Sequence, residues 1–197
     1  MKAIILCAGK GKRLGLKYKP KPMAKVAGLP IVSWILTHLT THGIMDICVN
    51  LHHLPLKLIE QLGMTDITFS GETKLMGTAG ALKRIGWWFG DDFVVANGDT
   101  ISNVDLTEMY EVHKMSGNVA TIFTHDTAEH NGGTFIFKQS ILKYIPEDKK
   151  YSIHNDLIPD LIRRGIPITL YKTKAFYLDC STPKKLKRAR RFFCPKI

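Results

Sequence analysis

The sequence predicts an α/β fold in which helices cover a mostly parallel β-sheet. Short apolar runs rich in β-branched residues alternate along the chain with amphipathic segments, which is the pattern of repeated strand–helix units. The first apolar run leads directly into a basic loop that contains glycines, and open sheets of this kind bind ligands at such strand ends. With 197 residues, 45% of them hydrophobic, the chain can bury one good core but is short for two.

In the first half, KAIILCA is the first expected strand, and residues 30–42 are expected to form a helix that Gly43 ends. The run FVVAN at 93–97 is almost uniformly apolar, as expected of a central strand that is buried on both faces. Between these elements we expect a strand at 46–50, a helix at 55–62, a strand at 66–70 and a helix at 79–86.

In the second half, residues 105–115 are expected to form a helix, and Asp105 is placed to cap it. A last helix should begin near residue 183, with Thr182 as its N-cap and Pro183 at its first position. The remaining expected elements are strands at 118–124, 133–137, 167–172 and 175–178 and a helix at 155–164.

The formal charge of +11 is concentrated at the two ends of the chain. Residues 1–45 carry eight Lys or Arg and no acid, and residues 180–197 carry seven and no acid. Such segments suit a polyanionic ligand, which on composition alone could be a nucleic acid or a nucleoside triphosphate. In the C-terminal stretch, the spacing of Leu186, Ala189 and Phe193 favours a helix that packs on the sheet and leaves its basic side chains in solvent.

The four cysteines, Cys7, Cys48, Cys180 and Cys194, lie far apart, so neither a disulfide framework nor a zinc site is indicated and free, mostly buried thiols are expected. The histidines are scattered without ligand spacing. The first apolar run is too short for a signal or membrane segment, so we expect a cytoplasmic protein without a membrane partner.

The loop after the first strand, Ala8-Gly9-Lys10-Gly11-Lys12-Arg13, would present backbone N–H groups that no side chain obstructs. Phosphate groups are the natural ligands of such a loop, although a tight turn with solvated lysines explains Gly-x-Gly equally well. Pro20 and Pro22 stiffen the backbone on either side of Lys21, so its ammonium would be held in place.

The run AIILCAGKGKRL, followed by KPKPMAKVAGLPI, resembles the opening of the sugar-1-phosphate nucleotidyltransferases. Three further stretches keep the order of that family: MGTAGALKRI resembles the segment that holds base and ribose, FVVANGDT the strand that ends in a magnesium carboxylate, and FYLDCSTPKKLKRA the segment with the second carboxylate. HNGGTFIF resembles the loop on the sugar side, so the likeness spans nearly the whole chain.

The resemblance implies a Rossmann-like, three-layer fold with a mixed, mostly parallel sheet, in a single nucleotidyltransferase domain over residues 1–197 without a C-terminal β-helix domain. It also implies an enzyme that joins a nucleoside triphosphate to a sugar 1-phosphate and releases pyrophosphate. Two polyanions must meet in that reaction, so its site needs cations and backbone donors more than a nucleophilic side chain. The resemblance leaves the oligomeric state open, with a homo-oligomer as one option.

By the same resemblance, Arg13 would hold the β- and γ-phosphates, Lys21 would stabilise charge on the α-phosphoryl group, and Asp99 and Asp179 would be ligands of Mg²⁺. Alternatively, either aspartate could be an ordinary turn residue after a strand. The neighbouring Gly98 favours this alternative for Asp99. The nucleotide-binding candidates are Ala8, Gly9, Gly11, Lys12, Glu72, Gly77 and Thr78. The sugar-binding candidates are Gly98, Asn131 and Gly132.

The sequence departs from the family at two places. Members usually carry a Glu-Lys-Pro element whose lysine contacts the sugar phosphate, but here only THDTAEH separates ATIF from NGGTFIF. Around Asp179 the family commonly has D-I-G-T-P, where this chain has D-C-S-T-P. The first departure motivates an alternative, a catalytically weak nucleotide-binding homologue. A nucleic-acid-binding protein is a third and lower-ranked possibility, because no recognised nucleic-acid motif accompanies the basic ends.

The choice of base depends on Glu72, five residues before Gly77. Uridylyl and thymidylyl members tend to have a glutamine there, whose amide both donates and accepts, whereas an ionised glutamate can only accept. Guanine presents two adjacent donors, and the segment is also similar to that of the guanylyltransferases that make GDP-heptose and GDP-mannose. The sequence therefore predicts GTP as the donor, with a solvated loop residue as the alternative for Glu72.

Overall fold

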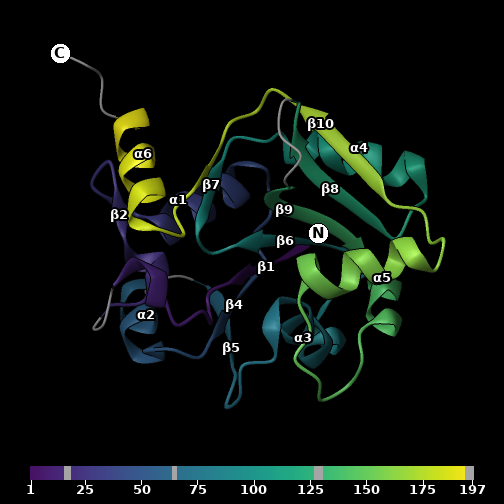
Figure 1. The fold of residues 1–197 in the computed structure, drawn as a ribbon, viewed down its shortest axis with the longest axis horizontal. Coiled ribbons are helices and arrows are strands. Elements are labelled where there is room, and N and C mark those ends of the chain that lie inside the picture. The colour runs from purple at the N-terminus through teal and green to yellow at the C-terminus, as the bar shows by residue number, and fades with distance from the viewer. Residues whose placement is uncertain (16–18, 64–65, 127–130, 194–197) are drawn as a thin grey trace.

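The computed structural model describes residues 1–15, 19–63, 66–126 and 131–193, and a seven-stranded sheet runs through its centre (Figure 1). Neighbouring strands follow the order β10 (Thr169–Thr173), β8 (Ala120–His125), β9 (Asn131–Lys138), β6 (Asp92–Asn97), β1 (Lys2–Leu6), β4 (Ile47–Leu51) and β5 (Ile67–Gly71). The first strand of the chain therefore lies in the interior of the sheet, between β6 and β4.

Most strand pairs of this sheet are parallel. β1 pairs with β4 and β6 in parallel, as β4 does with β5 and β10 with β8, whereas β9 pairs antiparallel with both of its neighbours, β6 and β8. The expectation of a mixed, mostly parallel sheet is confirmed. Since parallel strands end at one edge, the loops after β1, β4, β5 and β6 gather at the same side of the molecule.

Two layers of helices cover the sheet, because successive side chains of a strand point to opposite faces. In β1, Ala3 and Ile5 belong to one buried cluster and Ile4 to the other. The first cluster is completed by α1 (Ile31–Thr41), α2 (Pro55–Leu62), α4 (Leu106–Ser116) and α6 (Pro183–Phe193), and the second by α3 (Gly77–Arg84) and α5 (Ile158–Arg163). The three-layer architecture expected from the sequence is thus confirmed.

The helix expected at 155–164 is interrupted. Residues Ile153–Leu157 form a wide, π-type turn that continues into α5 at Ile158. Pro159 has no backbone N–H, so it cannot make the usual hydrogen bond to the carbonyl four residues earlier, and the turn before it widens.

Two short strand pairings were not predicted from the sequence. β2 (Lys25–Val26) and β3 (Leu29–Pro30) form a small hairpin before α1. β7 (Thr100–Ser102) pairs antiparallel with β11 (Tyr177–Asp179), so the segment after β6 and the segment before α6 lie side by side. The strand expected at 175–178 overlaps β11, but its pairing with β7 was not predicted. β2, β3 and β7 are too short to show a clear periodicity.

The expected caps are confirmed. Asp105 Oδ1 accepts hydrogen bonds from the N–H groups of Thr107 (2.9 Å) and Glu108 (3.0 Å). Thr182 Oγ1 accepts from the N–H of Lys185 at 3.3 Å, which fixes the start of α6. Cys7, Cys48 and Cys180 are free and buried, as expected, while Cys194 lies outside the described residues. Within the described ranges, no helix combines the length and apolar character needed to cross a membrane.

Candidate functional site

The site begins where β6 passes the end of β1. The Gly98 N–H donates to the Leu6 carbonyl at 3.1 Å. A Cβ at Gly98 would lie 2.6 Å from that carbonyl oxygen and 2.8 Å from Cys7 Sγ, so only glycine lets the two strand ends approach this closely. The close approach places Asp99 beside the first loop.

The buried amide of Asn50, at the end of β4, holds the start of that loop. Its Oδ1 accepts from the N–H groups of Cys7 (2.7 Å) and Ala8 (3.3 Å). Gly9 has open space where a Cβ would stand, and Gly11 adopts the left-handed conformation with φ 63°. The first loop is therefore pinned at its start and free of side chains at the glycine that faces the cavity.

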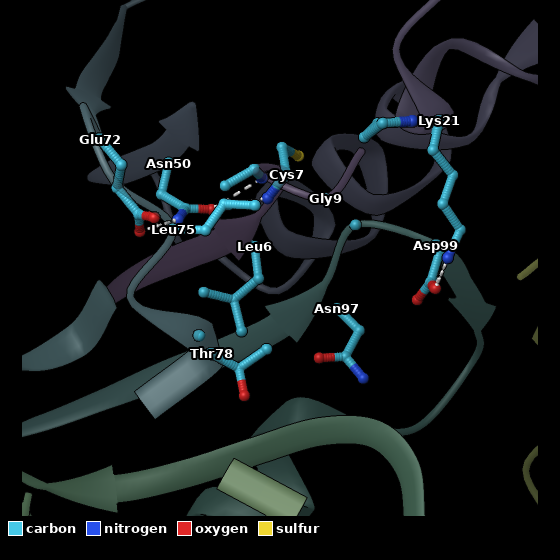
Figure 2. A pocket seen from close by; sticks show the side chains of 14 residues that line it. Leu6, Cys7, Gly9, Lys21, Asn50, Glu72, Leu75, Thr78, Asn97 and Asp99 are labelled. Carbon is cyan, nitrogen blue, oxygen red and sulfur yellow. Dashed lines mark hydrogen bonds and ion pairs between the residues drawn. The ribbon is translucent and has the colours of Figure 1, made fainter. Parts of the chain in front are cut away.

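Arg13 and Lys12 lie in a short 3₁₀ turn, Lys12–Leu14, and both are exposed. Arg13 lines the second of the two cavities described below, and Lys12 lines neither of the two. Lys21 lies in a second 3₁₀ turn, Lys21–Met23, with prolines on either side, as the sequence suggested. Its ammonium forms an ion pair with the Asp99 carboxylate (Figure 2).

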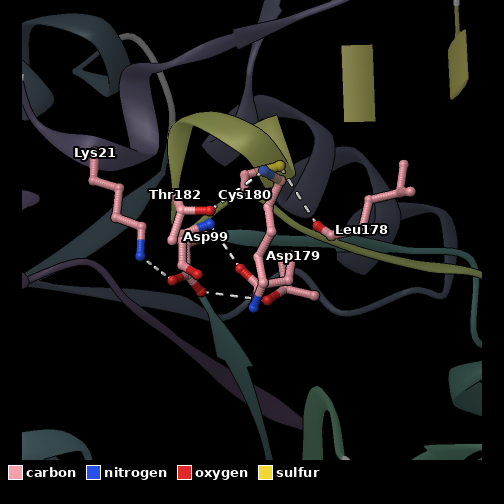
Figure 3. Close-up of polar contacts among 9 residues, drawn as sticks. Lys21, Asp99, Leu178, Asp179, Cys180 and Thr182 are labelled. Atoms are coloured by element: carbon pink, nitrogen blue, oxygen red, sulfur yellow. Dashed lines mark hydrogen bonds and ion pairs between the residues drawn. The ribbon is translucent and has the colours of Figure 1, made fainter. Parts of the chain in front are cut away.

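Asp179 reaches the same place through the pairing of β7 with β11. Asp179 pairs with Thr100, and the Cys180 N–H donates to the Asp99 carbonyl at 2.8 Å (Figure 3). The Asp179 carboxylate accepts from the N–H of Ser181 and from Lys185 Nζ, both at 2.6 Å. The two predicted metal ligands are therefore adjacent, and the D-C-S-T-P departure keeps a carboxylate at the turn.

The pKa of Asp179 reflects opposing effects. Burial raises the pKa of this carboxyl, but the hydrogen bonds from Lys185 and Ser181 together outweigh burial and hold the pKa below its ordinary value. The carboxylate is thus favoured in its charged form, which is the form that a metal ion or an ammonium requires.

A cavity of about 250 Å³ opens next to Asp99, and Figure 2 views it from close by. Glu72, only 7% exposed, lines this cavity. Glu72 Oε1 accepts from Asn50 Nδ2 at 2.8 Å and Oε2 accepts from the Met76 N–H at 3.2 Å, so Glu72 is not a solvated loop residue. The first cavity is lined by Leu6, Cys7, Ala8, Gly9, Lys21, Pro22, Asn50, Glu72, Leu75, Gly77, Thr78, Asn97, Gly98 and Asp99.

The start of α3 forms one wall of this cavity through a contact that the sequence did not predict. The Tyr151 carbonyl accepts from the N–H groups of Ala79 (2.9 Å) and Gly80 (3.1 Å), and a Cβ at Gly77 would lie 2.5 Å from that oxygen. The Ile153 N–H donates to Thr78 Oγ1 at 2.7 Å. Gly77 and Thr78 therefore dock residues 151–153 onto α3, besides lining the cavity.

A second cavity, of about 880 Å³, adjoins the first and shares Thr78, Asn97 and Asp99 with it. Its walls come from β7, β9, β11, the turn at Ser152–His154 and α6. The second cavity is lined by Arg13, Thr78, Asn97, Asp99, Thr100, His125, Gly133, Phe135, Ser152, Ile153, His154, Phe176, Tyr177, Leu178, Asp179, Ser181, Lys185, Arg188, Ala189 and Phe192.

The predicted sugar-side residues are distributed unevenly. Gly98 lines the first cavity, while Gly132 packs under Phe123, whose ring carbons would lie 2.2 Å from a Cβ there. Asn131 begins β9, and Gly133, with φ 76°, lines the second cavity.

Sequence reasoning missed several lining residues. Asn50 and Asn97 could have been recognised in the sequence, because each is a polar amide at the carboxyl end of a buried strand. No sequence pattern marked His125, His154 or Lys185, because only the packing of distant segments brings them to the second cavity.

Comparisons with known proteins show which family the chain resembles. Residues 2–132 match the family model described as nucleotidyl transferase. Among relatives, the UTP–glucose-1-phosphate uridylyltransferase of Synechocystis sp. is 30% identical, covering 85% of this chain and 56% of its own length. The mannose-1-phosphate guanylyltransferase of Mycobacterium tuberculosis is 24% identical, and the match covers 94% of this chain and 62% of the relative. The D-glycero-alpha-D-manno-heptose 1-phosphate guanylyltransferase of Aneurinibacillus thermoaerophilus is 25% identical, covering 97% of each.

Solved structures share the fold. HddC from Yersinia pseudotuberculosis complexed with GMP-PN superposes with a TM-score of 0.81 at 23% identity, covering 98% of this chain and 99% of that one. A putative glucose-1-phosphate thymidylyltransferase from Bacillus anthracis gives a TM-score of 0.84 at 21% identity, and the match covers 100% of this chain and 96% of that one. The chain spans 56% and 62% of the first two relatives named above and 97% of the third. Because the family model matches 131 consecutive residues, which include the first loop, Lys21 and Asp99, this chain belongs to the nucleotidyl transferase family.

Proposed function

We propose that the chain transfers a nucleoside monophosphate from a nucleoside triphosphate to a sugar 1-phosphate. A phosphate oxygen of the sugar 1-phosphate attacks the α-phosphorus, and the bond from that phosphorus to the bridging oxygen of the β-phosphate breaks, so pyrophosphate leaves. The observation that carries this proposal is the adjacency of Asp99 and Asp179, with Lys21 beside them, where the two cavities meet.

The two carboxylates fit a magnesium ion. Magnesium typically takes one or two protein carboxylates and completes its coordination with phosphates and waters. Among the described residues no group of three or more His, Cys, Asp or Glu side chains could hold a metal, so an ion at this edge would depend on these two carboxylates together with phosphate and water ligands. Asp99 and Asp179 would hold the ion, and when bound it would neutralise charge on the phosphates.

The protein's own groups supply the rest of the chemistry. The attacking phosphate oxygen is already anionic, so no side chain needs to remove a proton from it. Lys21, held between two prolines, would stabilise negative charge on the α-phosphoryl group, and Arg13 would hold the departing phosphates. The N–H groups of the first loop, fixed by Asn50, would orient the triphosphate before reaction.

GTP is the donor that we propose. Each Glu72 oxygen already accepts one hydrogen bond from the protein, and a carboxylate oxygen can accept two. The remaining lone pairs at the cavity suit the adjacent N1–H and 2-amino donors of guanine. Two of the three named relatives are guanylyltransferases, while the first is a uridylyltransferase.

The test is a substrate panel. The protein is incubated with Mg²⁺, each of GTP, UTP, CTP, ATP and dTTP, and a set of sugar 1-phosphates, and pyrophosphate release is measured. Turnover with the highest kcat/KM for GTP supports both parts of the proposal. Turnover with a preference for UTP or dTTP contradicts the base assignment alone. Nucleotide binding without turnover across the panel would favour the catalytically weak homologue.

A further inference from the structure

The second cavity contains cations that could bind a second anion. The family resemblance predicts a lysine in a Glu-Lys-Pro element that this sequence does not contain, so no group has yet been assigned to the acceptor's phosphate. Three Lys or Arg side chains line this cavity within the described residues, namely Arg13, Lys185 and Arg188. Arg13 comes from the first loop, whereas the other two come from α6.

Lys185 and Arg188 lie on one side of α6. They are three residues apart, so their side chains emerge from neighbouring positions on the helix surface. Leu186 and Ala189 are buried and anchor the helix on the first core cluster, while Lys187 is exposed and does not line the cavity. The helix therefore directs two cations toward the cavity and a third away from it.

Two contacts hold α6 in this orientation. Its first turn is capped by Thr182, and Arg190 Nε donates to the Lys25 carbonyl at 2.9 Å, which ties the helix to β2. Lys185 and Arg188 thus project from a fixed support rather than from a loop.

Each of the two proposed metal-binding carboxylates forms an ion pair with one lysine. Lys21 pairs with Asp99 (Figure 3), and Lys185 Nζ lies 2.6 Å from Asp179 Oδ2. The Lys185 side chain is 52% exposed, against 13% for Lys21, so it can turn from the carboxylate to a ligand in the cavity with little rearrangement. No described residue forms an ion pair with Arg188, so its charge is available as well.

We infer that Lys185 and Arg188 form the binding subsite for the phosphate of the acceptor, a phosphate monoester dianion, and so replace the missing lysine of the family. The inference rests on the proposed function for its choice of ligand. Two cations match the two negative charges of such a phosphate, and the position of Lys185 at Asp179 puts the bound phosphate next to the carboxylates. The phosphate of the acceptor is thereby held by side chains of α6.

The test compares Lys185→Gln and Arg188→Gln with Lys187→Gln, which removes the same charge from the solvent side of α6. With a non-hydrolysable nucleoside triphosphate analogue saturating the first cavity, each protein is titrated by calorimetry with α-D-mannose 1-phosphate, α-D-glucose 1-phosphate and inorganic phosphate. In the two cavity variants the Kd for phosphate-bearing ligands should rise about tenfold or more, because each loses a charge-assisted hydrogen bond. Lys187→Gln should bind as the wild type does.

Steady-state kinetics supplies an independent readout. Lys185→Gln and Arg188→Gln should raise the KM for the acceptor and leave the Kd for the nucleotide analogue unchanged, and Lys185→Arg should restore much of the loss. Unchanged phosphate affinity in both cavity variants overturns the subsite even if the wild type turns over. Conversely, a wild type that shows no turnover but binds phosphate through Lys185 and Arg188 contradicts the proposed function and supports the subsite.

Discussion

Asp99 and Asp179 are joined by a backbone hydrogen bond, in which the Cys180 N–H donates to the Asp99 carbonyl at 2.8 Å. The pairing of β7 with β11 holds this contact, so the backbones of the two residues lie next to each other. Each carboxylate has a lysine partner that limits its movement further.

Asp99→Asn and Asp179→Asn should each lower turnover by about a hundredfold or more, because each removes a charge where two polyanions meet. The fold should persist, since asparagine is isosteric with aspartate. Binding of Mn²⁺ in the presence of nucleotide, followed by electron paramagnetic resonance, should weaken in parallel. Asp91→Asn, at an exposed position, is the control. Wild-type turnover in either site variant would remove the proposed metal site.

Lys21→Ala should reduce kcat by roughly a hundredfold while changing the Kd of a triphosphate analogue much less, because its interaction strengthens as charge develops on the α-phosphoryl group. Single-turnover kinetics and calorimetry separate the two quantities. Lys25→Ala removes the same charge from an exposed residue outside both cavities and should be neutral. An effect confined to nucleotide affinity would contradict the assigned role.

Glu72→Gln should destabilise the protein by about 1 to 3 kcal/mol, since both Glu72 oxygens accept from buried donors and the new NH₂ group would face one of them. Adding Asn50→Asp should restore much of that loss, because the new carboxylate can accept from the amide introduced by Glu72→Gln and still accept from Cys7 and Ala8. Urea denaturation of the wild type, both single variants and the double variant measures the coupling. Additive effects in this cycle would show that the two side chains act independently.

Gly98→Ala should destabilise the protein by about 1 to 3 kcal/mol, because its Cβ would lie 2.6 Å from the Leu6 carbonyl oxygen and force β6 away from β1. Gly90→Ala is the matched control, since no atom lies within 4 Å of its Cβ position. Thermal unfolding compares the two variants. Equal melting temperatures would refute the close-approach argument.

His38, in α1, should make the protein less stable in mild acid. Burial, together with the nearby His42, lowers the pKa of His38 to about 4 from 6.5. Between those values the unfolded chain binds a proton that the folded chain does not, so stability falls as the pH drops through this window. A change from pH 7 to pH 5 should lower the free energy of unfolding of both proteins. The decrease should be about 1 to 2 kcal/mol smaller for His38→Gln than for the wild type.

Urea denaturation at both pH values measures this difference. The control is Thr37→Gln, which changes an exposed, non-titrating residue of α1 and should keep the pH dependence of the wild type. An identical pH dependence in His38→Gln and the wild type would rule out His38 as the source of the acid sensitivity.

Residue patterns alone were enough to predict the fold class, most of the longer elements and the local character of the first loop. Hydrophobic periodicity and capping residues act over a few positions, so they can be recognised without knowing what packs against them; the helix that begins after Thr182 is one example. The ordered motifs also indicated the family, which the match over residues 2–132 confirmed. The roles of individual residues remain predictions.

Only the tertiary structure decided how the two halves of the site meet. The β7–β11 pairing brings Asp179 to Asp99, Asn50 joins the first loop to Glu72, and α6 carries Lys185 and Arg188 to the second cavity. None of these contacts follows from local pattern, because each depends on which strand ends become neighbours and on backbone approaches as close as that of Gly98 to Leu6. Contacts between distant segments are fixed by the packing of the whole core, and a local pattern in one segment does not specify its partner.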